Sequence, residues 1–325
     1  REFKPDCILR HHISLGSRWV AKREKIPYIT GTLAPIFWFS RKDPSVQYSF
    51  EPEQIPAWRS SLRTTISRWA MRWLFDRPLN RARAKHGFAP ERDLFFQEVI
   101  DAPALLGLWS PAFRSFAEDD PQNGTICGFS IYDRSHDNET PPAHVQAFVD
   151  ECKAQNRKPI VFTLGTSIVH HHNGFYELAA AVVEQLQVPA IMLVGKDEYA
   201  PAKLPPNVRA FAYAPFSTLF QHASAIIHHG GVGTTAQALR AGVPTVIVPF
   251  VNDEYDNAAR AARLGTSITL RAGHLNHKRL KDCLSAVLTN STYAQKAAMI
   301  AEKMRGENGA SKAADIIEQT ARKGE

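Results

Sequence analysis

The sequence predicts an α/β protein with two domains, each built on a doubly wound parallel sheet. Short, continuous apolar segments, such as residues 160–164 and 225–227, alternate with amphipathic segments of helical length. Uninterrupted apolar runs are typical of strands that a parallel sheet buries on both faces. The chain has 325 residues, which suits two domains that each bury a core of their own.

The order of the elements predicts where the domains meet. Residues 5–30 show a strand–helix–strand pattern that opens the first domain. The polar segment DRSHDNETPP at 133–142 ends in two prolines and is typical of a linker. We therefore expect a first domain over residues 1–140, a second over 141–310 and a closing helix over 311–325.

The composition is that of a globular protein, with 44% hydrophobic and 22% charged residues. No apolar run approaches the roughly 18–20 residues of a membrane span, and no signal peptide is recognised at the start. The four cysteines lack the paired spacing of zinc sites or disulfide frameworks. We therefore expect a cytoplasmic protein with reduced thiols.

The formal net charge of +7 is concentrated in one segment, residues 58–86. This segment contains eight basic residues and one acidic residue, so its excess equals that of the whole chain. The remainder is balanced, which argues against a general nucleic-acid-binding surface, and no nucleic acid is expected as a partner.

Within that segment, five large apolar residues recur at helical spacing, namely Trp58, Leu62, Ile66, Trp69 and Trp73. They define one face of an amphipathic helix that arginines flank. Most such faces pack on the core of their own domain, and we favour this interpretation. The alternative is a peripheral contact of residues 58–86 with the inner face of a membrane, because basic helices that carry tryptophan can lie in membrane interfaces.

The most informative stretch is residues 225–265, which predicts a strand, a glycine turn, a helix, a strand, a polar loop and a helix. The first strand leads into HHGGVGTT at 228–235, where small residues allow a ligand to approach the backbone. Free N–H groups and the positive end of the helix dipole suit such a turn to a phosphate.

The same turn also matches the G-x-G-x-x-A pattern of dinucleotide-binding proteins through Gly231, Gly233 and Ala236, with Asp253 at a suitable distance. That pattern normally follows the first strand of a nucleotide-binding domain. Here other strand–helix units precede it, which disfavours a dehydrogenase.

The whole stretch resembles the donor-binding signature of family 1 glycosyltransferases, which have the GT-B fold. The matching segments are HHGGVGTT at 228–235, RAGVP at 240–244, the acidic pair at 253–254 and DNAAR at 256–260. The likeness is nearest to bacterial members that glycosylate lipids, such as rhamnolipid rhamnosyltransferases and sterol glucosyltransferases. It implies two Rossmann-like domains facing a cleft, an N-terminal domain without its first strands, and a closing helix that braces that domain.

The resemblance assigns the diphosphate of a nucleotide sugar to the glycine turn and to the turn that follows residues 160–164. The residues implied are Thr166, His229, Gly231, Gly233, Thr234 and Thr235. Backbone amides of Gly233, Thr234 and Thr235 would meet the phosphate oxygens, with hydroxyls and the imidazole adding hydrogen bonds. A glycine turn capped by Thr234 would also be stable without any ligand.

The resemblance also implies contacts to the sugar and the nucleoside. Asp253 matches an aspartate that binds sugar hydroxyls, and Glu254 stands where the family usually has glutamine. Tyr213 matches an aromatic residue that stacks on the nucleobase. Gln237 stands where relatives with uridine donors hold the ribose by a glutamate, so it favours a thymidine diphosphate (dTDP) sugar, whose deoxyribose lacks the 2′-hydroxyl.

Family members usually carry a catalytic histidine after their first strand, and this chain has no counterpart to it. His11 and His12 end the first predicted strand and are candidates for a base or an acceptor contact, although paired histidines are more often structural. The consecutive histidines at 170–172 cannot all converge on one metal ion. No metal or other cofactor is expected, since the nucleotide sugar is a co-substrate.

These observations predict an inverting hexosyltransferase that moves a hexose or deoxyhexose from a dTDP- or UDP-sugar to a hydrophobic, lipid-like hydroxyl acceptor. Two alternatives stay open. A donor-binding subunit without activity, or an inactive fragment, would suit the missing strands, which a partner chain would then supply. A nucleotide-sugar epimerase would have the same fold and would release an altered sugar nucleotide without an acceptor.

Overall fold

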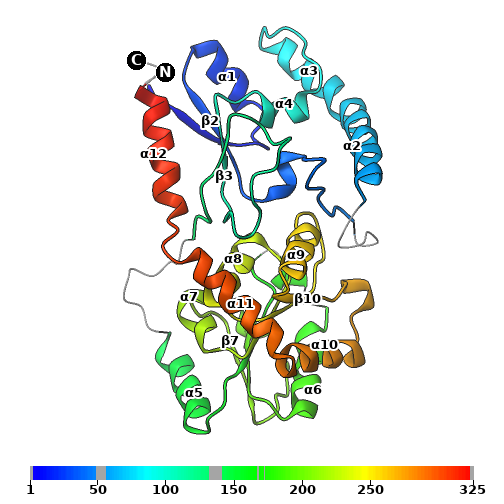
Figure 1. The fold of residues 1–325 in the computed structure, drawn as a ribbon, viewed down its shortest axis with the longest axis vertical. Coiled ribbons are helices and arrows are strands. Elements are labelled where there is room, and N and C mark those ends of the chain that lie inside the picture. Colours follow the sequence, from blue (N-terminus) through cyan, green and yellow to red (C-terminus); the bar gives the residue numbers. More distant parts are fainter. Residues whose placement is uncertain (1–2, 49–55, 132–140, 167, 172, 323–325) are drawn as a thin grey trace. The chain divides into compact units, whose positions relative to one another are not determined.

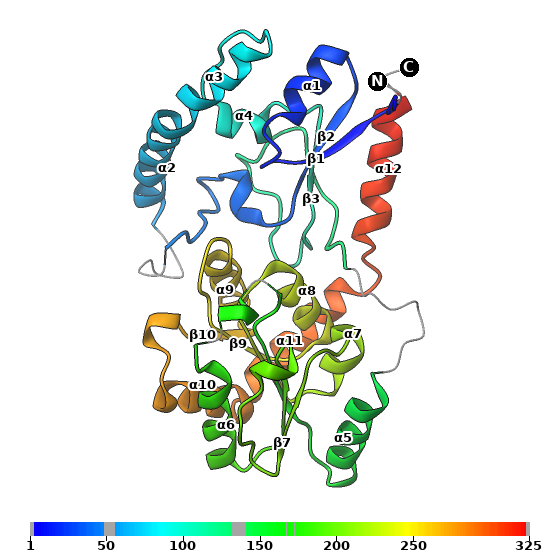
Figure 2. The same cartoon turned by 180° about the vertical axis from the view of Figure 1, so that it is seen from behind.

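The computed structural model describes residues 3–48, 56–131, 141–166, 168–171 and 173–322. The chain divides into two compact units (Figures 1 and 2). Over the described residues, the first unit covers 3–46, 56–130 and 307–322, and the second covers 47–48, 131, 141–166, 168–171 and 173–306. Most of the predicted linker at 133–142 lies outside the described residues.

The first unit is built on a parallel sheet of four strands within the described residues. In spatial order these are β1 (Ile8–His11), β2 (Tyr28–Thr32), β3 (Ala104–Gly107) and β4 (Gly124–Ile126). Each neighbouring pair is parallel. Helix α1 (Ser17–Glu24) joins β1 to β2, which confirms the strand–helix–strand pattern predicted for residues 5–30.

Helical elements surround this sheet. They are η1 (Pro35–Trp38), α2 (Ala57–Met71), the π-helical turn η2 (Arg72–Asp76), α3 (Arg77–Lys85), α4 (Leu94–Ile100) and the last helix of the chain, α12 (Gly309–Arg322). Helix α12 packs its apolar residues Ala313, Ile316 and Ile317 against Ile29 of β2 and Leu106 of β3. The apolar side of α12 therefore lies against the first sheet.

The apolar face predicted within residues 58–73 is helical but does not pack on a core. Its members, Trp58, Leu62, Ile66, Trp69 and Trp73, are each more than half exposed on α2 and η2. The favoured interpretation, packing on the domain core, is therefore wrong, because periodicity identifies an apolar face without saying what covers it. Among the described residues, no helix is both long enough and apolar enough to cross a membrane.

The second unit is a doubly wound parallel sheet, six strands wide over the residues that the structure describes. The spatial order is β10 (Ser267–Thr269), β9 (Thr245–Ile247), β8 (Ala225–His228), β5 (Ile160–Thr163), β6 (Ala190–Leu193) and β7 (Val208–Phe211). Strands β5, β6 and β7 follow one another towards one edge of the sheet, whereas β8, β9 and β10 follow one another towards the other edge. The carboxyl ends of β5 and β8 therefore flank the reversal of strand order, which is where open α/β sheets bind ligands.

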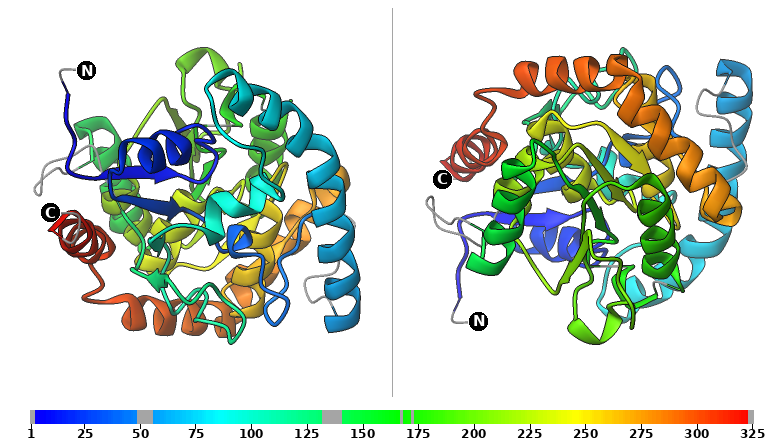
Figure 3. Two further views of the ribbon diagram at one scale, coloured as in Figure 1. Left: turned by 90° about the horizontal axis from the view of Figure 1, so that it is seen from above. Right: turned by 90° about the horizontal axis from the view of Figure 1, so that it is seen from below.

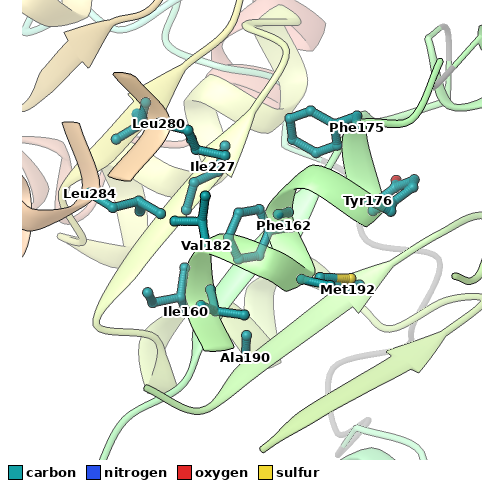
Figure 4. Close-up of a cluster of buried hydrophobic side chains, with 14 of the residues drawn as sticks. Ile160, Phe162, Phe175, Tyr176, Val182, Ala190, Met192, Ile227, Leu280 and Leu284 are labelled. Atoms are coloured by element: carbon teal, nitrogen blue, oxygen red, sulfur yellow. The ribbon is translucent and has the colours of Figure 1, made fainter. Parts of the chain in front are cut away.

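Helices cover both faces of this second sheet (Figure 3). They are α5 (Ala143–Ala154), α6 (Phe175–Leu186), α7 (Phe216–Leu219), α8 (Val232–Ala241), α9 (Glu254–Arg263), α10 (His277–Thr289) and α11 (Ser291–Met304), with short 3₁₀ turns at Val169–His171, Asp197–Tyr199, Phe220–His222 and Ala272–His274. Ile160 and Phe162 of β5 pack with Val182 and Leu280 on one face (Figure 4), whereas Val161 faces α5 and α7 on the other. Burial on both faces confirms the predicted parallel α/β fold.

Candidate functional site

The glycine turn lies between β8 and α8, at the point where the strand order reverses. Gly230 has a φ of +95°, a backbone conformation that favours glycine. A Cβ at Gly230 would also lie 2.9 Å from Cγ2 of Ile247 and 3.1 Å from the carbonyl oxygen of Glu254. The turn can therefore form only because this residue has no side chain, and it brings the start of α8 close to the loop that follows β9.

His229 packs its ring between two glycines from different turns. A Cβ at Gly231, the N-cap of α8, would lie 2.3 Å from the Nε2 atom of His229. A Cβ at Gly165, in the turn after β5, would lie 2.3 Å from Cε1 of the same ring. The imidazole thus joins the two turns that the sequence predicted as phosphate contacts, and it needs a glycine on each side.

Burial keeps the His229 ring uncharged. Its side chain is almost fully buried, and burial lowers the pKa of His229 to about 4. Its Nδ1 atom has no hydrogen-bond partner within the described chain. A neutral imidazole offers one donor and one acceptor, so His229 can supply a hydrogen bond but not a positive charge at neutral pH.

The first turn of α8 presents backbone donors. The amide of Thr235 donates to the carbonyl oxygen of Gly231 at 2.9 Å, and its hydroxyl donates to the same oxygen at 3.0 Å. Thr235 was predicted to bind the diphosphate, but both of its donors serve the helix itself. The amides of a helix that precede its first internal hydrogen bond have no partner inside that helix, and here these are Val232, Gly233 and Thr234.

The surface of this first turn is open at one residue. A Cβ at Gly233 would meet no atom within 4 Å, in contrast to Gly230 and Gly231, where it would collide with neighbouring atoms. Thr234 beside it is largely buried. Gly233 is also exposed, so a ligand can approach its backbone.

The loop after β9 is tied to the glycine turn by Asn257. Its Nδ2 atom donates to the carbonyl oxygen of Gly230 and to Oδ2 of Asp253, both at 2.9 Å. Asn257 is fully buried, and its Oδ1 atom has no partner in the part of the chain that the structure describes. Asn257 therefore positions the Asp253 carboxylate relative to the turn.

Glu254 shapes the same loop. Its Oε2 atom accepts hydrogen bonds from the amides of Phe250 at 2.7 Å and Val251 at 3.0 Å. Its Oε1 atom lies 4.0 Å from Nε2 of His229. Burial raises the pKa of Glu254 to about 7 and also raises the pKa of Asp253. Glu254, predicted as a sugar contact, thus uses one of its oxygens to fold the loop.

The remaining predicted donor contacts lie at different places on the sheet. Thr166 is exposed in the turn after β5, next to Gly165 and thus close to His229. Gln237 is largely buried in α8. Tyr213 is half exposed after β7, which is separated from β5 by β6. The structure therefore brings Thr166, His229, Gly231 and the Asp253 loop together, whereas Tyr213 follows the carboxyl end of β7, the last strand of the described sheet on that side.

The two predicted catalytic histidines end β1 in the first unit. His12 is buried, with its ring centroid 4.2 Å from that of His11 and 4.0 Å from that of Phe37. Burial lowers the pKa of His12 to about 3 and also lowers the pKa of His11. A group with so low a pKa is a weak base at neutral pH, so the packing favours a structural role for His12 and leaves His11 as the better candidate.

Of the histidines at 170–172, the contact that the structure describes is that of His170. Nδ1 of His170 lies 3.0 Å from the hydroxyl of Tyr199, and His172 lies outside the described residues. Over the described ranges, no group of three or more histidine, cysteine, aspartate or glutamate side chains is arranged to hold a metal ion.

Comparison with known proteins identifies relatives with the same signature. Residues 188–319 match the model of the family described as "Erythromycin biosynthesis protein CIII-like, C-terminal domain". Over 235 residues, or 69% of this chain, the sequence is 32% identical to a sterol 3-beta-glucosyltransferase of Saccharomyces cerevisiae. Over 215 residues, or 66% of the chain, it is 30% identical to the O-mycaminosyltylonolide 6-deoxyallosyltransferase of Streptomyces fradiae.

The chain belongs to the family 1 glycosyltransferases. The matched part corresponds to 19% of the yeast protein and 49% of the Streptomyces protein, so the chain spans less than half the length of either relative.

Solved structures of glycosyltransferases share the GT-B fold of this family 1 chain. The glycotransferase of kitacinnamycin matches with a TM-score of 0.74 at 20% identity, covering 98% of this chain and 77% of that one. The glycosyltransferase VinC, solved in complex with dTDP, matches with a TM-score of 0.67 at 20% identity, covering 98% and 72%. The predicted fold class of two parallel-sheet α/β domains is confirmed.

The high pKa of Glu254 predicts a pH-dependent effect of Glu254→Gln. Because the folded pKa of about 7 exceeds the usual 4.5, the contribution of Glu254 to wild-type stability is greatest at low pH and falls as the pH rises through that window. The glutamine oxygen accepts the same amide hydrogen bonds but does not ionise. Relative to wild type, the variant should gain up to about 3 kcal/mol of unfolding free energy between pH 4 and pH 8, taking about 1.4 kcal/mol per pKa unit.

Urea denaturation of both proteins at several pH values measures this difference. Groups other than Glu254 titrate in both proteins and cancel in the comparison. A difference in unfolding free energy that stays constant from pH 4 to pH 8 would contradict the raised pKa of Glu254.

Proposed function

We propose that this chain is the catalytic part of an inverting glycosyltransferase that moves a hexose or deoxyhexose from a nucleoside diphosphate sugar to a hydrophobic hydroxyl acceptor. The observation that carries the proposal is the open first turn of α8 at Gly233, beside the buried His229 ring. It lies at the reversal of strand order, where doubly wound sheets bind nucleotides.

The diphosphate is the part of the donor that this turn suits. Three backbone amides and the positive end of the α8 dipole stabilise negative charge at the leaving group without a metal ion. Donors that a helix holds in fixed positions cost no reorganisation when charge develops on the departing diphosphate. The Nδ1 atom of His229, which is buried and unpartnered in the described chain, is a further group that a ligand could satisfy.

The sugar is proposed to lie against Asp253. The carboxylate receives one hydrogen bond from Asn257 at Oδ2 and retains acceptor capacity for sugar hydroxyls. Since Asn257 also binds the Gly230 carbonyl, the sugar contact and the diphosphate contact are held in a fixed relation. Such fixed positioning of the donor lowers the barrier to displacement at the anomeric carbon.

We favour a dTDP-sugar as the donor because of the residue at position 237. Gln237 stands where uridine-using relatives carry a glutamate, and a neutral amide makes a weaker hydrogen bond to a ribose 2′-hydroxyl than a carboxylate does. A relative in structure, VinC, was solved in complex with dTDP. Tyr213 is proposed to stack on the base from its half-exposed position.

The acceptor is proposed to be a hydrophobic alcohol, with His11 as the candidate base. One matched relative is named for transfer to a sterol and another for transfer to O-mycaminosyltylonolide, and the sterol name supports an apolar acceptor. We propose that the protein works in the cytoplasm and reaches such an acceptor at the inner face of a membrane.

Replacing Gly233 by alanine should separate ligand binding from folding. The added methyl group meets nothing in the protein within 4 Å, and alanine is the better helix former, so thermal stability should be kept or slightly raised. The same methyl group would occupy the space of the phosphate oxygens. We expect calorimetry to show dTDP affinity reduced by about tenfold or more, with a matching fall in the rate of dTDP release from a dTDP-hexose.

Gly273→Ala is the matched control, because a Cβ there also meets no atom within 4 Å and the residue lies in the same unit. Its dTDP affinity should equal that of wild type. Wild-type dTDP affinity in Gly233→Ala would refute the proposed diphosphate site.

The nucleotide preference tests the role of Gln237. Wild type should bind dTDP at least as tightly as UDP, and Gln237→Glu should shift the ratio of affinities towards UDP by about fivefold to tenfold, because a carboxylate makes a charge-assisted bond to the ribose 2′-hydroxyl. Calorimetric titration of both proteins with both nucleotides gives the ratio, and a thermal melt confirms folding. Tighter binding of UDP than of dTDP by wild type would overturn the proposed preference.

A further inference from the structure

Helix α2 and the turn η2 present a row of large apolar side chains to solvent. Trp58 and Trp69 are each 69% exposed and Trp73 is 76% exposed, while Leu62 and Ile66 between them are each 56% exposed. We refer to these five side chains as the tryptophan face. Exposed clusters of large apolar side chains mark interaction sites in proteins that are otherwise well packed.

The five residues lie on one side of the helix. Their spacing of four, four, three and four residues places them within about a quarter of the helix circumference, at 3.6 residues per turn. Helices α2 and α3 follow one another along the first unit (Figures 1 and 2). The tryptophan face is therefore a continuous strip and not a scatter of single exposed residues.

Contacts with the rest of the first unit hold this helical segment in place. Arg68 and Arg72 both form ion pairs with Asp93, the latter at 3.0 Å. The ring of Phe75 stacks on Phe95 of α4 with centroids 5.3 Å apart. The carboxylate of Asp76 accepts hydrogen bonds at 2.9 Å from the backbone amides at 93 and 94. The segment is thus fastened to its own unit by its arginines, by Phe75 and by Asp76, while the tryptophan face stays exposed.

The charges around the strip indicate the kind of partner. Arg59, Arg77, Arg81 and Lys85 are exposed on the same helical segment. The only acidic residue of the segment, Asp76, is engaged with the backbone of α4. A second copy of this chain docking here by two-fold symmetry would bring like charges together, which disfavours a homodimer. A negatively charged surface with an apolar interior fits both features.

We propose that the tryptophan face docks the first unit on a membrane that contains anionic lipid, with α2 lying in the plane of the interface. Tryptophan suits this depth because its ring is apolar and its N–H group needs a polar partner. The cations would reach the phosphate and carboxylate groups of the lipid heads. The docking itself does not depend on the proposed function. Only its purpose, access to an acceptor dissolved in the membrane, rests on that function.

Sedimentation with lipid vesicles tests the docking. The protein should bind vesicles of phosphatidylcholine mixed with phosphatidylserine, should bind pure phosphatidylcholine much less, and should be released by high salt. The double variant Trp69→Ser/Trp73→Ser should bind the mixed vesicles about tenfold or more weakly. Both side chains are exposed, so the variant should keep its thermal stability.

A matched pair of leucines controls for exposed apolar surface in general. Leu62→Ser should weaken vesicle binding, whereas Leu9→Ser should not, although Leu9 on β1 is 55% exposed and Leu62 is 56% exposed. Equal binding by wild type and the double tryptophan variant would overturn the proposal. So would a wild-type dimer in solution that the double variant abolishes, since the face would then be an interface between copies.

Affinity for dTDP, measured on the same proteins, separates this proposal from the proposed function. Unchanged dTDP affinity in the double tryptophan variant is expected. Absent vesicle binding by a wild type that binds dTDP refutes the docking alone, and absent dTDP binding by a wild type that binds vesicles refutes the proposed function alone.

Discussion

The packing of one imidazole between two glycines is the constraint on which the second unit's site depends. The His229 ring fills the space where a Cβ at Gly165 or Gly231 would lie, so it sets the separation between the turns after β5 and β8. Two adjacent parallel strands already bring their carboxyl ends to one edge of the sheet. The ring fixes the spacing of the two turns, with the backbone amides at the start of α8 beside it.

A second set of contacts joins this wall to the loop after β9. Asn257 binds both the Gly230 carbonyl and the Asp253 carboxylate, and Glu254 holds the amides at 250 and 251. None of these side chains is more than partly exposed. Burying several polar groups at one place raises the free energy of the folded protein unless these groups bind one another or a ligand. Their concentration at the reversal of strand order is what a nucleotide-sugar site requires and what a purely structural turn does not.

The sequence predicted the sheet of the second unit and its glycine turn well, because buried parallel strands are continuous apolar runs and the family signature is long and specific. It could not predict that Gly165 and Gly231 enclose the same ring, since that contact joins distant parts of the chain. Glu254 was assigned to the sugar by its position, whereas its hydrogen bonds depend on how the loop folds. The tryptophan face shows the same limit: spacing defined the face, but only tertiary structure shows that it is exposed.

The crystal structure of this chain with dTDP tests the central claim most directly, which is that the first turn of α8 receives the diphosphate. The account predicts a phosphate oxygen at hydrogen-bond distance, about 2.7–3.2 Å, from the amide nitrogen of Gly233, with His229 still held between Gly165 and Gly231. A diphosphate bound elsewhere on the second unit, with this turn in contact with solvent only, would contradict it.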